Sequence, residues 1–232
     1  MKLIEYRALV NGTALSYWKS SGQKLIVFCS GFPQYTSSYH PFVQTLVELG
    51  YDLLVPKYHG TWESSGNFSL AESLDSVYTA LDVIKEGSMT ELFGMTSIAL
   101  PKGDPILLGF SYGGLVAQLI TDKPIGKKIL LMPFVDIELH GRDNLEKDLR
   151  FLNRAYQNVY RFDIDKVMSE MERVKQPLHN SGPFSLVIGS GDKVISQSEI
   201  QFLKEKYNPH TQIVEAGHTA NLTAEQYSRI LS

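Results

Sequence analysis

Short apolar segments alternate with longer segments of helical periodicity along most of the chain. Residues Leu3–Leu9 alternate polar and apolar side chains and lead to Asn11-Gly12, a dipeptide typical of two-residue hairpin turns. Thr13–Lys19 is therefore expected to return as a second strand. Six further apolar runs have the length and continuity of strands buried on both faces of a sheet, which gives eight strands in total. These runs are Lys24–Cys29, Tyr51–Val55, Pro105–Leu108, Lys128–Met132, Phe184–Ile188 and Thr211–Val214.

Between the predicted strands, apolar residues recur at steps of three and four. Leu70–Ile84 carries one such stripe and ends near Gly87, and Phe42–Leu49 carries another. Tyr112–Thr121 and Thr223–Leu231 are also predicted to be helices. Strands that alternate with helices predict an α/β fold with a mostly parallel sheet and helices on both faces. The opening hairpin supplies an antiparallel edge.

Two connections are longer than this alternation needs. Ser88–Gly103 has roughly 16 residues, where ~2–6 are typical of such a connection. Phe134–Pro183 separates two strands, and its stripes at Leu145–Val159 and Ile164–Met171 indicate helices. We expect a single domain over residues 1–232, in which residues 134–183 form a small helical cap and a crossover helix. Both long connections are expected to shape specificity.

Composition and charge narrow the class of protein. The 232 residues include 22 Lys and Arg against 25 Asp and Glu, a formal net charge of −3, and 43% of the residues are hydrophobic. A nearly neutral chain without long basic runs argues against a nucleic-acid partner. The single cysteine, Cys29, excludes an intrachain disulfide and a cysteine-rich zinc site. No apolar stretch reaches the ~18 residues that span a bilayer, and the first residues suit a strand better than a signal peptide, so we expect a cytoplasmic protein.

A serine motif lies between a predicted strand and a predicted helix. Residues 109–113 read GFSYG, which matches the pattern G-x-S-x-G with Ser111 at its centre. This strand–turn–helix setting is the one that the motif requires of a nucleophilic serine. The flanking glycines leave room for a sharp turn, and the following helix directs its positive N-terminal end toward developing negative charge. The alternative is that Ser111 is only a helix N-cap.

A serine hydroxyl needs a neighbouring base to become a nucleophile. Among six histidines, only His218 follows the last predicted strand and precedes the closing helix. Parallel topology brings such a position to the same sheet edge as Ser111. The other histidines lie at the starts of elements, after the fourth strand, or in or beside the proposed cap: His40, His59, His140, His179 and His210.

The imidazole in turn needs a carboxylate that orients it and stabilises its cation. Asp192 lies in the Gly-rich turn Gly189–Val194, directly after a predicted strand. Asp136, four residues beyond Met132, is the alternative. We prefer Asp192 because its Gly-rich loop is more typical of a functional loop than the entrance to a cap.

With these three loops, essentially the whole chain resembles the α/β-hydrolase family. The chain order Ser111, Asp192, His218 matches the order of nucleophile, acid and histidine in that family. The resemblance implies an α/β-hydrolase fold and an oxyanion hole made by two backbone N–H groups. One donor would be Tyr112, directly after the nucleophile, and the other Phe32, in the loop after the third strand.

Two loops depart from the pattern of the family. The oxyanion loop has Ser30-Gly31, where family members often carry His-Gly. After the fourth strand, many relatives resemble D-x-R-G-x-G-x-S, whereas this chain has Lys57 and His59 at the acidic and arginine positions and retains Ser64. We interpret the second change as one of packing, with a catalytic role for His59 as a minor alternative.

The resemblance implies acyl transfer to water through an acyl-enzyme, without a metal or an organic cofactor. A carboxylesterase that acts on a small or medium acyl ester is the first hypothesis, and aromatic residues of the cap could line its acyl pocket or simply pack on the sheet: Phe151, Tyr156, Tyr160 and Phe162. A thioesterase and an aminopeptidase-type hydrolase remain alternatives. A ligand-binding or signalling protein of the same fold, with little turnover, is the alternative of another class.

Overall fold

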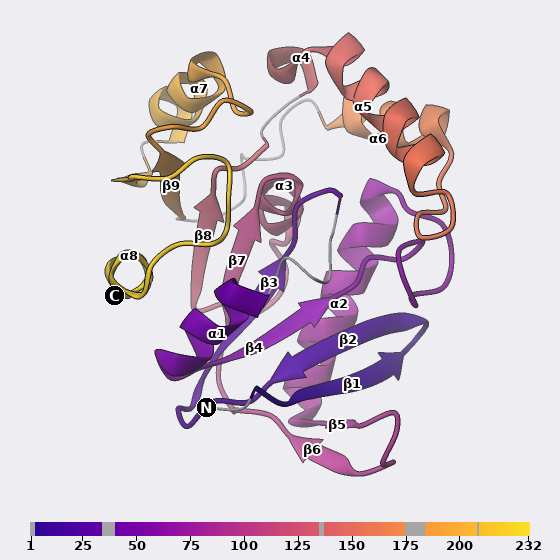
Figure 1. Cartoon of the computed structure of the whole chain (residues 1–232), viewed down its shortest axis with the longest axis vertical. Helices are drawn as coiled ribbons and strands as arrows, with labels where there is room; N and C mark the ends of the chain where they lie inside the picture. The colour runs from indigo at the N-terminus through magenta and orange to yellow at the C-terminus, as the bar shows by residue number, and fades with distance from the viewer. Residues whose placement is uncertain (1–2, 34–39, 135–136, 175–183, 208) are drawn as a thin grey trace.

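The computed structural model describes residues 3–33, 40–134, 137–174, 184–207 and 209–232 (Figure 1). Eight strands form one sheet in the order β1-β2-β4-β3-β7-β8-β9-β10. Strand β2 is antiparallel to both of its neighbours, and all other neighbouring strands are parallel, so the predicted fold class is confirmed. The strands are β1 (Glu5–Val10), β2 (Thr13–Trp18), β3 (Lys24–Cys29), β4 (Tyr51–Pro56), β7 (Ile106–Phe110), β8 (Lys127–Leu131), β9 (Ser185–Gly189) and β10 (His210–Val214).

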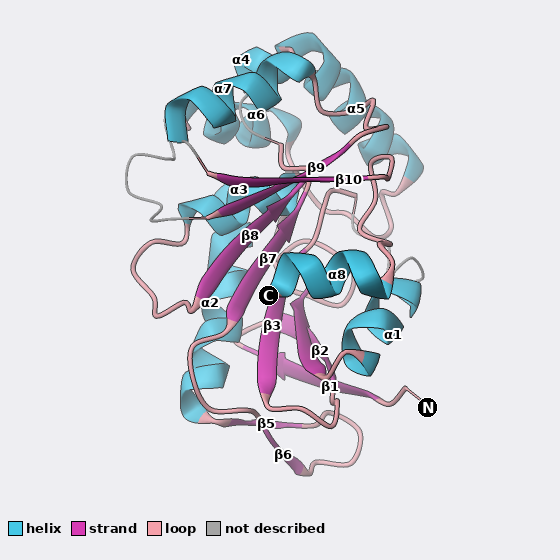
Figure 2. Ribbon diagram, turned by 90° about the vertical axis from the view of Figure 1, so that its left-hand side faces the viewer, coloured by secondary structure: helices cyan, strands magenta, loops and turns pink. Residues whose placement is uncertain are grey.

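Helices cover both faces of this sheet. Figure 2 shows α1 and α8 on one side of the sheet and α2 and α3 on the other. Along β3, Val27 and Cys29 pack into the core beneath α2 and α3, whereas Ile26 and Phe28 pack into the core beneath α1 and α8. Burial on both faces explains why these strands are continuously apolar. The helices are α1 (His40–Glu48), α2 (Leu70–Glu86), α3 (Tyr112–Leu119), α4 (Ile137–His140), α5 (Arg142–Ala155), α6 (Ile164–Arg173), α7 (Gln197–Tyr207) and α8 (Ala224–Leu231).

Local signals set the ends of the best-predicted helices. The side chain of Ser69 caps the start of α2 by accepting a hydrogen bond from the N–H of Glu72, and Gly87 ends the helix with a left-handed φ of 79°. Thr223 and Gln226 form a reciprocal capping box at the start of α8. Within the described ranges, no helix combines the length and the apolar composition needed to cross a bilayer.

Residues 88–103, which the sequence marked only as a long connection, contain a small hairpin. Strands β5 (Ser88–Thr90) and β6 (Ser97–Ala99) pair antiparallel as a separate two-stranded sheet. The N–H of Leu92, in the turn, donates to the carbonyl of Arg7 at 2.6 Å and joins the hairpin to β1. In Figure 1 the hairpin lies at the opposite end of the molecule from α4, α5 and α6. The hairpin is thus far from the helices of the other long connection (Figure 1).

Helices α4, α5 and α6 lie between β8 and β9, within the connection that the sequence marked as long. Helix α5 ends at Ala155, so the predicted stripe does not continue as a helix to Val159. Only Leu149 and Leu152 of α5 are buried, and α6 packs against both α5 and α2. Helix α5 is thus attached to the rest of the molecule through few buried side chains.

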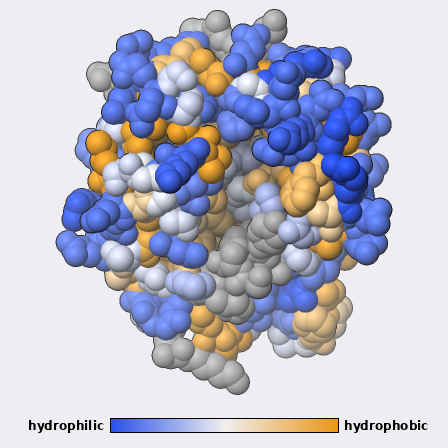
Figure 3. Space-filling view, turned by 45° about the horizontal axis from the view of Figure 1, so that its top comes forward, coloured by the Kyte–Doolittle hydropathy of each residue, from blue (hydrophilic) through white to orange (hydrophobic). Residues whose placement is uncertain are grey.

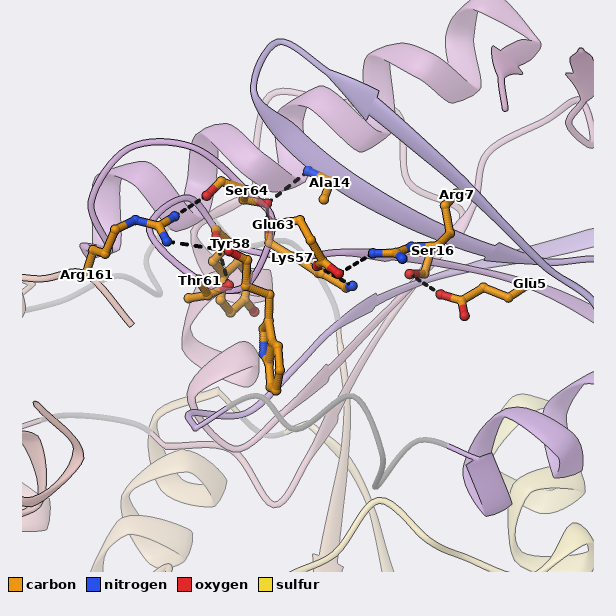
Figure 4. A network of polar contacts seen from close by, with 11 residues as sticks. Glu5, Arg7, Ala14, Ser16, Lys57, Tyr58, Thr61, Glu63, Ser64 and Arg161 are labelled. Atoms are coloured by element: carbon orange, nitrogen blue, oxygen red, sulfur yellow. Dashed lines mark hydrogen bonds and ion pairs between the residues drawn. The ribbon is translucent and has the colours of Figure 1, made fainter. Parts of the chain in front are cut away.

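A polar network fixes the loop after β4 (Figure 4). Lys57 is 4% exposed, and its ammonium lies 2.7 Å from a carboxylate oxygen of Glu63. The same carboxylate also pairs with Arg7. Partial burial opposes ionisation of Glu63, but the hydrogen bonds from Lys57 and Arg7 outweigh it and lower its pKa. The hydroxyl of Ser64 accepts from the N–H of Ala14 at 2.9 Å. The loop is thereby held against the opening hairpin.

His59 belongs to the same structural network. One ring nitrogen lies 3.2 Å from the hydroxyl of Thr13, and the other lies 3.2 Å from the carbonyl of Ser65. The backbone N–H of His59 donates to the hydroxyl of Ser76. Both ring nitrogens are thus occupied in fixing the loop. These contacts agree with the interpretation of Lys57 and His59 as changes in packing.

Candidate active site

Ser111 lies in a sharp turn between β7 and α3, with a φ of 51°. For a residue other than glycine, such a conformation costs about 1–3 kcal/mol, and strained residues of this kind cluster at active sites. A Cβ atom at Gly109 would overlap the carbonyl of Gly113, and a Cβ atom at Gly113 would overlap the carbonyl of Cys29. The crowding that the motif predicts is present. The Ser111 side chain makes no capping hydrogen bond to α3, so the N-cap alternative has no support.

Asp192 and His218 lie in the loops that follow β9 and β10. The Nδ1 atom of His218 is 2.8 Å from Oδ2 of Asp192, whose side chain is 2% exposed. The other carboxylate oxygen of Asp192 accepts from the N–H groups of Val194, at 2.8 Å, and Ile195, at 3.1 Å. The carboxylate is therefore held by its own loop, and it leaves Nε2 of His218 for proton transfer.

Backbone contacts connect these two loops. The N–H of Ser190 donates to the carbonyl of Val214, and the N–H of Gly191 donates to the carbonyl of Ala216, each at 2.9 Å. A Cβ atom at Gly189 would lie 2.7 Å from the carbonyl of Ala216, so glycine is needed where the loops approach. The relative position of acid and histidine is thus set by main-chain groups.

His218 also lies close to the serine turn. Its ring centroid is 4.9 Å from that of Phe110, the residue directly before Ser111. Among the described residues, no hydrogen bond joins Ser111 to His218. Catalytic hydrogen bonds are often long in the absence of substrate and tighten when it binds. The structure therefore brings the acid and the histidine into contact, and places the serine in the turn after β7, which β8 separates from β9 in the sheet.

The loop after β3 approaches Ser111 from the other side. A Cβ atom at Gly31 would lie 3.2 Å from Cβ of Ser111, and the ring of Phe32 stacks on Phe68 with centroids 4.4 Å apart. Over the part of the chain that is described, the backbone N–H groups of Phe32 and Tyr112 have no acceptor. Both are thus available to a ligand beside the serine, and Tyr112 begins α3, whose N-terminal end favours negative charge.

Ser111 opens into a cavity of about 280 Å³ beneath α4 and α5. Figure 3 looks onto this end of the molecule, where the outer surface is mostly hydrophilic and is broken by hydrophobic residues. The lining is mainly apolar, with His140 and Asp148 among its few polar residues. It consists of Phe32, Pro33, Ser111, Tyr112, Phe134, His140, Leu145, Asp148, Leu149, Phe151, Leu152, Met171, Val194 and Ile195.

Of the four aromatic residues considered for the acyl pocket, Phe151 lines this cavity. The others pack elsewhere: Tyr160 and Phe162 meet the ring of Phe32 edge-on, and Tyr156 contacts Tyr160. The helical stripe of α5 indicated that its leucines face inward. Nothing in the sequence indicated that His140 would reach the cavity.

The remaining candidates are placed as follows. Asp136 and His179 lie outside the described residues. His210 begins β10 and is exposed. Cys29 is buried and free, and burial raises the pKa of its thiol, so it is no nucleophile at neutral pH. In the described parts of the chain, no group of three or more His, Cys, Asp or Glu side chains could hold a metal ion.

Solved structures with the same fold cover nearly the whole chain. An esterase from Pyrococcus furiosus superposes with a TM-score of 0.67 at 16% identity, covering 99% of this chain and 90% of that one. An esterase from Exiguobacterium antarcticum gives 0.63 at 16% identity, covering 98% and 99%. The thioesterase domain of the curacin biosynthetic pathway gives 0.64 at 17% identity, covering 100% of both chains. The α/β-hydrolase fold expected from the sequence is confirmed.

Comparisons of the sequence itself identify a family. Comparison with curated proteins gave no significant match. The sequence profile of one family matches residues 89–230, a range that includes Ser111, Asp192 and His218. The chain therefore belongs to the uncharacterised protein family UPF0227.

Proposed function

We propose that the protein is a serine hydrolase that cleaves carboxylic esters of small or medium acyl groups through an acyl-enzyme intermediate. The observation that carries the proposal is the 2.8 Å contact between Asp192 and His218, next to the positive-φ turn of Ser111. The esterase folds among the structural neighbours add support. No metal or organic cofactor takes part in this reaction.

Each group has a defined role in the proposed reaction. His218 removes the proton from Oγ of Ser111, which attacks the ester carbonyl, while Asp192 stabilises the imidazolium. The N–H groups of Phe32 and Tyr112 donate to the oxyanion of the tetrahedral intermediate. His218 then protonates the leaving alcohol. Water, activated by the same imidazole, hydrolyses the acyl-enzyme and restores the serine.

We further propose that residues 134–183 act as the cap of this single-domain hydrolase. Helices α4 and α5 contribute His140, Leu145 and Leu149 to the cavity wall, so the acyl group would lie between these helices and Ser111. A mainly apolar lining favours alkyl chains over charged acyl groups. A volume of about 280 Å³ favours small or medium ones.

A thioester substrate is the second candidate. The thioesterase domain of the curacin pathway aligns with this chain over 100% of both lengths. The proposed machinery acts on an acyl carbonyl whether alcohol or thiol leaves. Acyl-CoA thioesters with the same acyl groups as the test esters therefore distinguish the two substrate classes by their kcat/KM.

The first experiment compares wild type with Ser111→Ala on p-nitrophenyl esters of increasing chain length. Loss of the nucleophile is expected to lower kcat by about 10⁵-fold or more. His210→Ala, an exposed histidine that does not line the cavity, is the matched control and is expected to keep full activity. Turnover by folded Ser111→Ala at the wild-type rate would refute the proposal. Tight binding of esters by wild type without turnover would instead favour a ligand-binding protein.

A further inference from the structure

A second pair of a histidine and a carboxylate lies at the wall of the cavity, apart from the groups of the proposed reaction. His140, at the end of α4, lines the cavity, and its side chain is 15% exposed. Its ring packs against Phe134, with centroids 5.0 Å apart. Its Nδ1 atom is 3.8 Å from Oε1 of Glu199, whose side chain on α7 is fully buried. The proposed hydrolysis uses neither residue.

Only one of the two oxygen atoms of the Glu199 carboxylate takes part in capping α7. Its Oε2 atom accepts from the N–H of Ser196 at 2.8 Å and from the Ser196 hydroxyl at 2.9 Å, which caps the start of α7. Oε1 accepts no hydrogen bond from any described residue. A buried carboxylate oxygen is unfavourable unless a cation faces it, and His140 is the group in that position.

The surroundings of His140 favour its charged form. Its interaction with Glu199 raises the pKa of His140 above the ordinary value and outweighs the opposing effect of partial burial. Asp148, on α5, also lines the cavity and raises the pKa of His140 further. Helix α6, the third helix packed against α4, contributes Met171 to the lining. With Nδ1 facing Glu199, Nε2 is the donor left for a ligand.

From this geometry we propose that His140 is a specificity-determining residue, which donates a hydrogen bond from Nε2 to a neutral oxygen atom on the acyl chain of the substrate. This inference rests on the proposed function, because the same cavity would hold the acyl group. The preferred substrates are then oxo-acyl esters rather than plain alkyl esters. A carboxylate on the acyl chain is disfavoured, because Glu199 and Asp148 place two negative charges around the single positive charge of His140.

The size of the preference follows from the cost of an unsatisfied donor. A site built to hydrogen-bond a substrate rejects an analogue that lacks the partner, because its own polar group then remains desolvated and unpaired. A hydrogen bond to a charged group corresponds to a preference of about tenfold or more. Glu199 acts as a positioning residue, since it orients the imidazole and maintains its charge.

The test uses p-nitrophenyl esters of one chain length: hexanoate, the oxohexanoates with the keto group at the third, fourth or fifth carbon, and the adipate monoester. Rates are divided by those of alkaline hydrolysis to remove intrinsic reactivity. For wild type, at least one oxo ester is expected to exceed hexanoate in kcat/KM by about tenfold, and the adipate monoester to fall below hexanoate. If no oxo ester exceeds hexanoate, the inference is wrong while the proposed function stands. Absence of all ester hydrolysis overturns both.

His140→Phe removes the donor but keeps a ring against Phe134. It is expected to lose the oxo preference, so that the ratio of kcat/KM for the best oxo ester to that for hexanoate falls by about tenfold. His210→Phe, the matched control, is expected to keep the preference. A preference that survives His140→Phe refutes the role of His140. If His140→Phe fails to fold, the pH profile of the oxo-to-alkyl ratio in Glu199→Gln tests the role of His140 instead.

Glu199→Gln keeps an oxygen acceptor for the Ser196 cap and removes the charge that faces His140. A keto oxygen on the substrate can accept a hydrogen bond only when Nε2 of His140 carries a hydrogen. Because Nδ1–H faces Glu199, Nε2 carries a hydrogen only in the protonated imidazolium. The preference is therefore present below the pKa of His140 and lost as the pH rises through it. Glu199→Gln lowers that pKa, so the loss is expected at a lower pH than in wild type. Identical pH profiles of the oxo-to-alkyl ratio would contradict the positioning role.

Discussion

The serine turn and helix α5 border the same cavity but are built in different ways. Around Ser111 the main chain packs against itself: Gly113 lies against the carbonyl of Cys29, and every residue from Tyr112 to Gln118 is buried. Helix α5, by contrast, buries only Leu149 and Leu152 of its 14 residues. The proposed chemistry thus depends on backbone geometry fixed by the core, whereas the proposed substrate wall is a surface helix. Substitutions in the first region should destroy activity or stability, and those in the second should change substrate preference.

After loss of the nucleophile itself, the largest expected effect concerns the acid of the proposed triad. Asp192→Asn keeps an oxygen for the N–H groups of Val194 and Ile195 but places an amide against Nδ1 of His218. The imidazole is then held in the wrong tautomer, and kcat is expected to fall by about 10⁴-fold without loss of fold. Steady-state kinetics and thermal unfolding measure the two quantities. A loss of less than tenfold would show that Asp192 does not orient the base.

The next effect is one of stability. Gly113→Ala introduces a Cβ atom where the carbonyls of Cys29 and Ser30 already lie, and is expected to lower the free energy of unfolding by about 3 kcal/mol. At Gly191 the nearest atom to an added Cβ is 3.4 Å away, so Gly191→Ala is the matched control and should change the free energy by about 0.5 kcal/mol or less. Urea unfolding distinguishes the two. Equal effects would mean that the serine turn is not specially crowded.

The smallest effect is expected in the helical wall. Phe151 lines the cavity but is 58% exposed, so Phe151→Ala should leave stability within about 0.5 kcal/mol of wild type. Loss of part of the apolar wall should raise KM for hexanoate by about threefold and leave KM for acetate unchanged. Phe93→Ala, at a 74% exposed phenylalanine of the distant β5–β6 hairpin, is the control. An equal rise in KM for both esters in Phe151→Ala would remove α5 from the acyl site.

The same contrast explains what could be predicted from the sequence. The strands, the serine turn and the long helix α2 carry local signals, such as the glycines at 109, 113 and 87, which act through neighbouring backbone. The β5–β6 hairpin was missed because its strands are only three residues long, too short for a periodic pattern. Helix α7 was not singled out, since Glu199 is buried among its few inward residues.

The cavity wall could not be predicted for a different reason. His140 lies on α4, which precedes β9 in the sequence, and Glu199 lies on α7, which follows β9. Only tertiary packing brings the two side chains together. Likewise, Tyr160 and Phe162 belong to the same segment as Phe151, but they pack around Phe32 instead of lining the cavity. A sequence pattern gives the inward face of a helix. It does not say which buried neighbour that face meets.

The most direct test of the central claim is the rate and position of labelling by a serine-directed fluorophosphonate, followed by peptide mapping in a mass spectrometer. A single adduct is expected on Ser111 of wild type, and labelling is expected to be at least about 10²-fold slower in His218→Ala, because the imidazole removes the proton from the attacking hydroxyl. An adduct on another residue, or equally fast labelling of Ser111 without His218, would contradict the proposed roles of Ser111 and His218.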